Sequence, residues 1–119
     1  QLGVVVVAAP RGERHEVGAL MVAMLASLRG FTALYLGADV PENEIAYVAE
    51  VRNVELVLLS VVNLAPAEVR QVARGLSTSV SPRTRIIMGG AASLAVEGTR
   101  VEQLADLAAL DVMLRSIAA

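Results

Sequence analysis

The residues of this chain with the clearest potential for chemistry surround its only histidine. Glu13 lies two residues before His15, and Gly18 lies three residues after it. A neutral imidazole is a common metal ligand, and its second ring nitrogen needs an acceptor that fixes the tautomer, a role that Glu13 is placed to fill. Because the chain has no cysteine and no second histidine, a conventional zinc site is not expected. A metal that brings its own equatorial ligands needs only one protein donor, so the pattern indicates a macrocyclic metal cofactor.

Two further features fall where a ligand of a parallel sheet would be held. Ser60 ends one apolar run of the chain, and the pair Gly89-Gly90 follows another. Each has an ordinary alternative, since loop histidines, serines at strand ends and glycine pairs in turns are common without any ligand. Gly18 stands in the first turn of an expected helix, where glycine costs about 1 kcal/mol relative to alanine, and close approach by a ligand would explain it. Their joint placement, rather than any one residue, favours a cofactor site.

Hydrophobic periodicity predicts alternating strands and helices along the whole chain. The expected strands cover 3–8, 32–36, 55–61, 85–88 and, more weakly, 99–101. The expected helices cover 16–29, 42–53 and 66–77, followed by a short helix after Gly90 and a last helix from about 103. Asp39 is placed to cap the second helix. The uncharged first helix is expected to have Met21 and Met24 in the core and to be covered on both sides, the second cover being the cofactor, a missing domain or another subunit.

This alternation, without internal repeats, predicts an α/β fold: a doubly wound, five-stranded parallel sheet with helices on both faces. The common flavodoxin-like order of such a sheet is 2-1-3-4-5, and its ligands bind beyond the carboxyl ends of strands 1 and 3. This topology would bring His15, Ser60 and Gly89 to one edge of the sheet. The chain of 119 residues suffices for a single domain over 1–119.

Composition argues against several classes of function. Hydrophobic residues make up 55% of the chain and aromatic residues 3%, which suits buried parallel strands with a core of small and aliphatic side chains. The 12 acidic and 10 basic residues give no cationic field that would hold nucleic acid. No run reaches the roughly 18 apolar residues that span a bilayer, and no signal peptide is visible, so a cytoplasmic domain without a membrane partner is expected. The start at Gln1 suggests a fragment or a processed product of a longer protein.

Nucleotide-type sites known on this fold do not match the sequence. A response-regulator receiver needs paired acids at the end of the first strand and an aspartate at the end of the third, where Val7, Ala8 and Ser60 stand instead. The glycine-rich Lys-Ser/Thr run of a P-loop and the G-x-G-x-x-G spacing of a dinucleotide site are both absent. The first loop also lacks the serine and threonine residues of a flavin-binding loop.

The spacing of these elements resembles the cobalamin-binding domain family. Glu13-x-His15-x-x-Gly18 is followed after 41 residues by Ser60-x-Val62, and after 26 more by Gly89-Gly90. The match spans about 75 residues, and the order of strands and helices agrees over the whole chain. Most members of the family carry aspartate two residues before the histidine, and Glu13 departs from this pattern.

The segment over 9–16, APRGERHE, is similar to a narrower group, the light-responsive MerR-type transcriptional repressors that use adenosylcobalamin as photosensor. The resemblance implies "base-off, His-on" binding, in which His15 ligates cobalt from below and displaces the cofactor's own dimethylbenzimidazole. The displaced nucleotide tail would enter the sheet edge. Its expected contacts are Gly18, Ser60, Val62, Gly89 and Gly90, with Leu64 and Ala91 as further candidates and Glu13 supporting the histidine.

The same resemblance implies partners that these residues do not include. In that group a DNA-binding helix-turn-helix domain and a four-helix bundle precede the module, and adenosylcobalamin favours a DNA-binding homo-oligomer in the dark. The expected function is therefore a sensory domain without catalytic turnover. The alternative is the corrinoid-carrying module of a cobalamin-dependent methyltransferase or mutase. A protein-interaction domain that kept the fold and lost the ligand is a further alternative.

Overall fold

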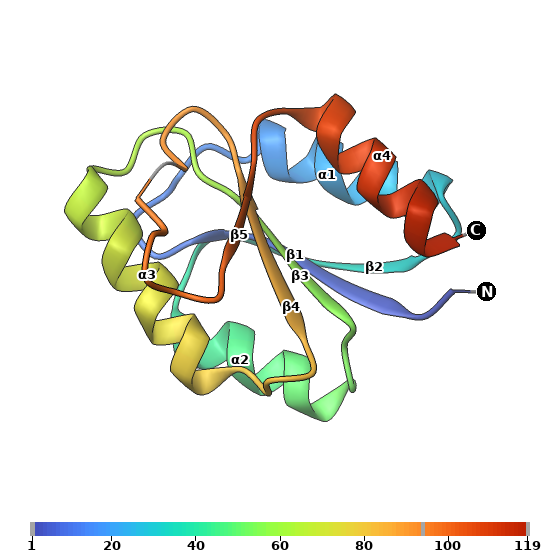
Figure 1. Ribbon diagram of the computed structural model, residues 1–119, viewed down its shortest axis with the longest axis horizontal. Coiled ribbons are helices and arrows are strands. Elements are labelled where there is room, and N and C mark those ends of the chain that lie inside the picture. The colour runs from blue at the N-terminus through green and yellow to red at the C-terminus, as the bar shows by residue number, and fades with distance from the viewer. Residues whose placement is uncertain (1, 94, 119) are drawn as a thin grey trace.

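The computed structural model describes residues 2–93 and 95–118 of the chain (Figure 1). Strands and helices alternate up to β4, and a long connection of turns precedes the last strand. In chain order the elements are β1 (Val4–Pro10), α1 (Val17–Leu28), β2 (Thr32–Val40), α2 (Glu42–Val51), β3 (Leu56–Ser60), α3 (Pro66–Ser79), β4 (Arg85–Gly89), β5 (Glu102–Leu104) and α4 (Leu107–Ala118).

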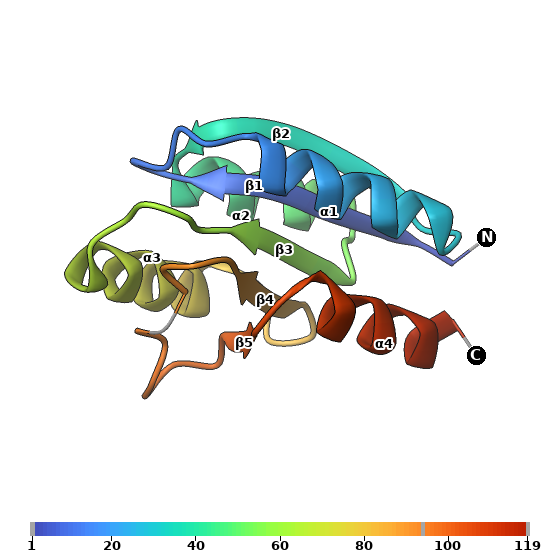
Figure 2. The same ribbon diagram turned by 90° about the horizontal axis from the view of Figure 1, so that it is seen from above.

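The five strands form one parallel sheet in the order β2-β1-β3-β4-β5, which confirms the predicted fold class. Helices α1 and α4 cover one face of the sheet, and α2 and α3 cover the other (Figures 1 and 2). Successive side chains of a strand point to opposite faces. Accordingly, Val5 and Val7 of β1 enter the core beneath α1 and α4, whereas Val6 and Ala8 enter the core beneath α2 and α3. The uninterrupted apolar run of β1 is thus explained by burial on both faces.

The region after β4 differs from the sequence prediction. Between β4 and β5 the described residues form turns rather than a short helix, β5 lies at Glu102–Leu104 rather than 99–101, and α4 begins at Leu107. A physical reason for this difference lies in Arg100. Its guanidinium donates hydrogen bonds to the carbonyl oxygens of Ser77, Val80, Ser81 and Thr84, which ties the segment before β5 to the end of α3 and to the turn between α3 and β4.

The prediction that Met21 and Met24 lie in the core of the domain is wrong. Their exposed fractions are 46% and 65%, while the small residues Ala19 and Ala26 are fully buried against the sheet. Small side chains let helix α1 pack closely on the sheet, and Leu20, Met21, Met24 and Leu28 are exposed on its other side. No helix within the described residues is long and apolar enough to cross a membrane.

Candidate functional site

The loop between β1 and α1 is organised around the carboxylate of Glu13, which is fully buried. One oxygen, Oε1, accepts hydrogen bonds from the backbone amides of Val62 and Asn63, both at 2.7 Å. The other, Oε2, lies 2.8 Å from Nδ1 of His15. A carboxylate can only accept hydrogen bonds, so Nδ1 carries a proton, and in the neutral form of the imidazole the lone pair is on Nε2. The His15 side chain is 56% exposed, which leaves Nε2 available to a metal.

Hydrogen bonding keeps Glu13 ionised despite its burial. Burial is the largest single influence and raises the pKa of Glu13. The hydrogen bonds from Asn63, His15 and Val62 act in the opposite direction and together outweigh it, so the pKa lies below 4.5. The charged form therefore persists at neutral pH as the acceptor that orients the imidazole.

The backbone of this loop is held by the end of β2. Asp39 does not cap α2 as the sequence suggested, because Pro41 occupies the cap position without a side-chain hydrogen bond. Instead, Oδ1 of Asp39 accepts a hydrogen bond of 2.7 Å from the amide of Gly12, and the Asp39 amide donates one of 2.8 Å to the carbonyl oxygen of Glu13. Sequence analysis missed this role, since nothing in the local pattern distinguishes it from capping.

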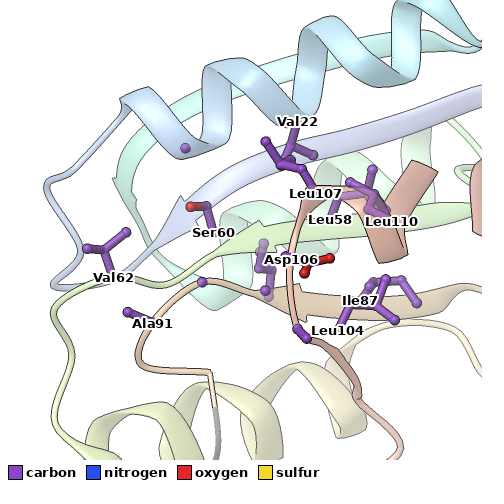
Figure 3. A pocket seen from close by; sticks show the side chains of 15 residues that line it. Val22, Leu58, Ser60, Val62, Ile87, Ala91, Leu104, Asp106, Leu107 and Leu110 are labelled. Carbon is purple, nitrogen blue, oxygen red and sulfur yellow. The ribbon is translucent and has the colours of Figure 1, made fainter. Parts of the chain in front are cut away.

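A cavity of about 260 Å³ lies beside this loop, between α1, α4 and the carboxyl ends of β3 and β4 (Figure 3). Most of its wall is apolar, with Val22 of α1 facing Leu107 and Leu110 of α4 across it (Figure 3). Six predicted site residues line the cavity: Gly18, Ser60, Val62, Gly89, Gly90 and Ala91.

The remaining predicted site residues lie outside this cavity. Glu13 and His15 form the loop at its side, and Leu64 lines a separate hollow together with Ala91. The far wall was missed by sequence analysis. It consists of Val22, Leu58, Leu59, Ile87, Leu104, Ala105, Asp106, Leu107 and Leu110. Several of these precede or begin α4, a region whose boundaries the sequence placed too early, and the others look like ordinary core residues.

Two glycines are required by the shape of the cavity mouth. A Cβ atom on Gly18 would lie only 2.5 Å from Oγ of Ser60. Gly90 has a φ of +112°, and a Cβ atom there would collide with the backbone of Val61. The Ser60 side chain is almost buried, and its hydroxyl has no hydrogen-bond partner among the described residues. A polar atom without a partner at the wall of an apolar cavity is suited to receive a ligand.

Comparison with known proteins decides the family. The family model of the B12 binding domain matches residues 3–114. The chain belongs to the B12-binding domain family. A cobalamin or other corrinoid is therefore its ligand class. A comparison with curated proteins gave no match.

Solved structures with the same fold include several corrinoid proteins. A cobalamin-binding protein from Desulfitobacterium hafniense is 25% identical with a TM-score of 0.75, and the match covers 98% of this chain and 60% of that one. The monomethylamine corrinoid protein of Methanosarcina barkeri is 21% identical with a TM-score of 0.76, covering 98% and 58%. The methanol:cobalamin methyltransferase complex of the same organism is 19% identical with a TM-score of 0.81, covering 98% and 46%. This chain thus spans about 60% or less of the length of these proteins.

The residues of the structure fit a corrinoid. No group of three or more His, Cys, Asp or Glu side chains that could hold a bare metal ion occurs within 2–93 and 95–118. A corrin supplies the equatorial nitrogens itself, so the single donor His15 is enough. The cavity is slightly smaller than the range of about 300–1,000 Å³ typical of pockets that enclose a drug-sized molecule. It therefore has room for one part of a cobalamin rather than for the whole cofactor.

Proposed function

We propose that this domain binds a cobalamin with His15 as the lower axial ligand of cobalt and with the cofactor's own base held in the cavity. The observation that carries the proposal is the 2.8 Å contact between Nδ1 of His15 and the buried carboxylate of Glu13, which directs the basic Nε2 outward beside an apolar cavity. A hydrogen bond from the distal nitrogen to a carboxylate orients a ligating histidine and raises its basicity. The bound cofactor would supply a cobalt centre that can carry an alkyl group.

The remaining roles follow from the lining of the cavity. Ser60 would donate its free hydroxyl hydrogen to the displaced base, and Gly18 and Gly90 would keep space for the tail. Val62, Gly89 and Ala91 would contact it, while Leu64 would touch the cofactor from the neighbouring hollow. In this proposal the domain holds and presents the cofactor and catalyses no reaction by itself.

Titration with hydroxocobalamin tests this proposal. The wild-type chain is expected to change the visible spectrum of the cofactor on binding, and His15→Ala should bind at least tenfold more weakly. Arg14→Ala is the matched control, because Arg14 lies in the same loop, is exposed and its side chain has no hydrogen bond or ion pair among the described residues. Equal spectra and affinities for wild type and His15→Ala would refute the axial role, and no binding by the wild type would favour a domain that has lost its ligand.

The structural neighbours favour a corrinoid carrier as the larger system. One of them is named as a monomethylamine corrinoid protein and another as a methanol:cobalamin methyltransferase complex. In such a system the domain would present the cofactor to a separate methyltransferase. The test loads this chain with cobalamin, reduces it to cob(I)alamin with titanium(III) citrate, and adds a methyltransferase encoded beside it together with monomethylamine or methanol. Transfer of the methyl cation to cob(I)alamin should give methylcob(III)alamin and release ammonia or water, and the absence of methylcobalamin would contradict the carrier role.

The loop around His15 favours a second candidate, a light-responsive regulator. Glu13, in place of the family's more common aspartate, and the flanking segment 9–16 are similar to the MerR-type repressors. In this case adenosylcobalamin would stabilise a DNA-binding oligomer, because a ligand shifts assembly only if it binds one state better than the other. Sedimentation of the protein that carries this domain, before and after green illumination, tests the idea. Identical profiles would contradict it.

A further inference from the structure

Asp39 occupies an unusual backbone conformation where β2 reaches the histidine loop. Its φ is +53°, in the left-handed region that residues other than glycine seldom adopt. The pairing of β1 with β2 shifts register between Val7 and Ala8 and again between Ala8 and Pro10. Because of these irregularities, Asp39 is paired with no residue of β1 and lies against the histidine loop instead. Aspartate tolerates the left-handed conformation better than most residues.

Asp39 ties two consecutive residues of the loop. Its Oδ1 accepts the Gly12 amide at 2.7 Å, and its own amide donates to the carbonyl oxygen of Glu13 at 2.8 Å. The Glu13 amide in turn donates to the carbonyl oxygen of Pro10 at 2.8 Å. The backbone amide and the backbone carbonyl of Glu13 are thus both hydrogen-bonded, and the carbonyl is bonded to Asp39.

The position of His15 depends on this arrangement. Glu13 is the only hydrogen-bond partner of the imidazole among the described residues, and its Oε2 also accepts the His15 amide at 3.3 Å. A displaced Glu13 backbone would therefore displace the imidazole. We infer that Asp39 is a positioning residue for the axial histidine, holding the loop in its ligating geometry before the cofactor arrives. This inference rests on the proposed function of His15.

The physical benefit is preorganisation. A loop that is already ordered loses less conformational entropy on binding, and a supporting contact outside the ligand shell keeps the donor within the narrow geometry that a metal bond requires. The Asp39 side chain is exposed, so its hydrogen bond with the Gly12 amide, rather than core packing, is its visible contribution.

Substitutions of Asp39 can separate the hydrogen bond from the backbone conformation. Asp39→Asn keeps an oxygen acceptor and tolerates positive φ, so it should behave as wild type. Asp39→Gly keeps the conformation and loses the acceptor, whereas Asp39→Ala loses both. Asn53→Ala is the matched control, since Asn53 has a φ of +51° and one side-chain hydrogen bond of 3.2 Å to Arg83, outside the cavity and the loop.

The probe is cob(II)inamide, which lacks the nucleotide base, so any axial nitrogen splitting in its electron paramagnetic resonance spectrum comes from the protein. Wild type, Asp39→Asn and Asn53→Ala should show the splitting fully. Asp39→Ala should lower the fraction of bound cobalt that carries an axial nitrogen at least threefold. Asp39→Gly should give a fraction between those of wild type and Asp39→Ala. An unchanged fraction in Asp39→Ala, or an equal loss in Asn53→Ala, would overturn the inference. His15→Ala distinguishes the two proposals: if wild type resembles it, the axial role itself fails.

Amide hydrogen exchange without cofactor covers the case in which Asp39→Ala does not fold. The Gly12 amide should be protected in wild type and Asp39→Asn, and should exchange at least tenfold faster in Asp39→Gly. Equal exchange rates of Gly12 in wild type and Asp39→Gly would show that Asp39 does not hold the loop, and would also overturn the inference.

Discussion

Gly18 on α1 and Ser60 at the end of β3 approach so closely that a Cβ atom on Gly18 would strike the Ser60 hydroxyl. This Cβ atom would lie 2.5 Å from Oγ of Ser60, well inside van der Waals contact, so the hydroxyl would have to move. Both residues line the cavity. The glycine in the first turn of α1 is thus explained by the small space left for a Cβ atom, and not by a backbone conformation that only glycine adopts easily.

Gly18→Ala should therefore impair binding of the nucleotide tail while leaving the fold intact. Alanine is about 1 kcal/mol better than glycine in a helix, which offsets part of the local repulsion. We expect cobalamin affinity to fall at least tenfold and cobinamide affinity, which involves no tail, to change less than twofold. Absorbance titrations with both corrinoids measure this difference.

A double variant provides the control for that experiment. Ser60→Ala removes the hydroxyl that the methyl group of Gly18→Ala would strike, and the Cβ of residue 60 would remain at an ordinary 3.7 Å from that methyl group. Gly18→Ala combined with Ser60→Ala should recover part of the cobalamin affinity, though not the hydrogen bond to the base. If the double variant binds no better than Gly18→Ala, the steric explanation is wrong.

Glu13→Gln should weaken axial coordination less than His15→Ala, since Glu13 tunes a bond that it does not make. Glutamine has one acceptor oxygen for the four N–H groups that now donate to the carboxylate. A buried donor left unsatisfied costs about 1–3 kcal/mol, which urea unfolding should detect. Hydroxocobalamin titration then ranks the variants, and equal affinities of Glu13→Gln and His15→Ala would contradict the prediction. Glu50→Gln, at an exposed position of α2, is the control.

The stability of the domain should fall in acid, with Glu13 as a principal cause. Burial raises the pKa of Glu13, but the hydrogen bonds from Asn63, His15 and Val62 outweigh it and lower the pKa below 4.5. A carboxyl with a lower pKa in the folded state contributes stability that is complete above the unfolded value and is lost as the pH falls through the folded value. The free energy of unfolding should therefore decline below about pH 4.5.

The Glu13→Gln variant isolates this contribution. Arg85 lowers the pKa of Glu102, and Arg29 lowers the pKa of Asp111, so both carboxyls also favour folding above their own titration range. They remain in the variant, and only the Glu13 contribution disappears. Urea unfolding of both proteins from about pH 3 to 7 should show a shallower acid decline in Glu13→Gln. Parallel declines would show that Glu13 does not carry the effect.

Arg100→Ala should destabilise the domain by about 2 kcal/mol or more, because a charged group that donates several hydrogen bonds is lost. Its guanidinium donates hydrogen bonds of 2.6–3.2 Å to four carbonyl oxygens. Arg100→Lys should recover only part of the loss, since an ammonium group cannot reproduce the planar fork. Arg74→Ala is the control, since Arg74 is exposed and its side chain has no hydrogen bond or ion pair among the described residues. Equal melting temperatures for the two alanine variants would disprove the role of Arg100.

Sequence patterns predicted the sheet and half of the site because both depend on local signals. The apolar run of β1 and the turn residues around it determine a buried parallel strand, and the topology then places His15, Ser60 and Gly89 at one edge. The rest depends on contacts between distant residues. Arg100 shifts the last strand by binding the end of α3, Asp39 binds the loop instead of capping a helix, and the large side chains of α1 face outward. None of these contacts appears in the hydrophobic periodicity on which the sequence prediction depends.

The most direct test of the central claim uses isotope labelling to show whether the axial nitrogen in bound cob(II)alamin comes from the protein or from the cofactor. The chain is labelled with ¹⁵N in histidine, loaded with unlabelled cofactor and measured by electron paramagnetic resonance. Ligation by His15 predicts that each line is split in two by ¹⁵N, and that His15→Ala abolishes this splitting. A threefold splitting from the ¹⁴N of the cofactor's own base would show that the base stays on cobalt, and would contradict the account.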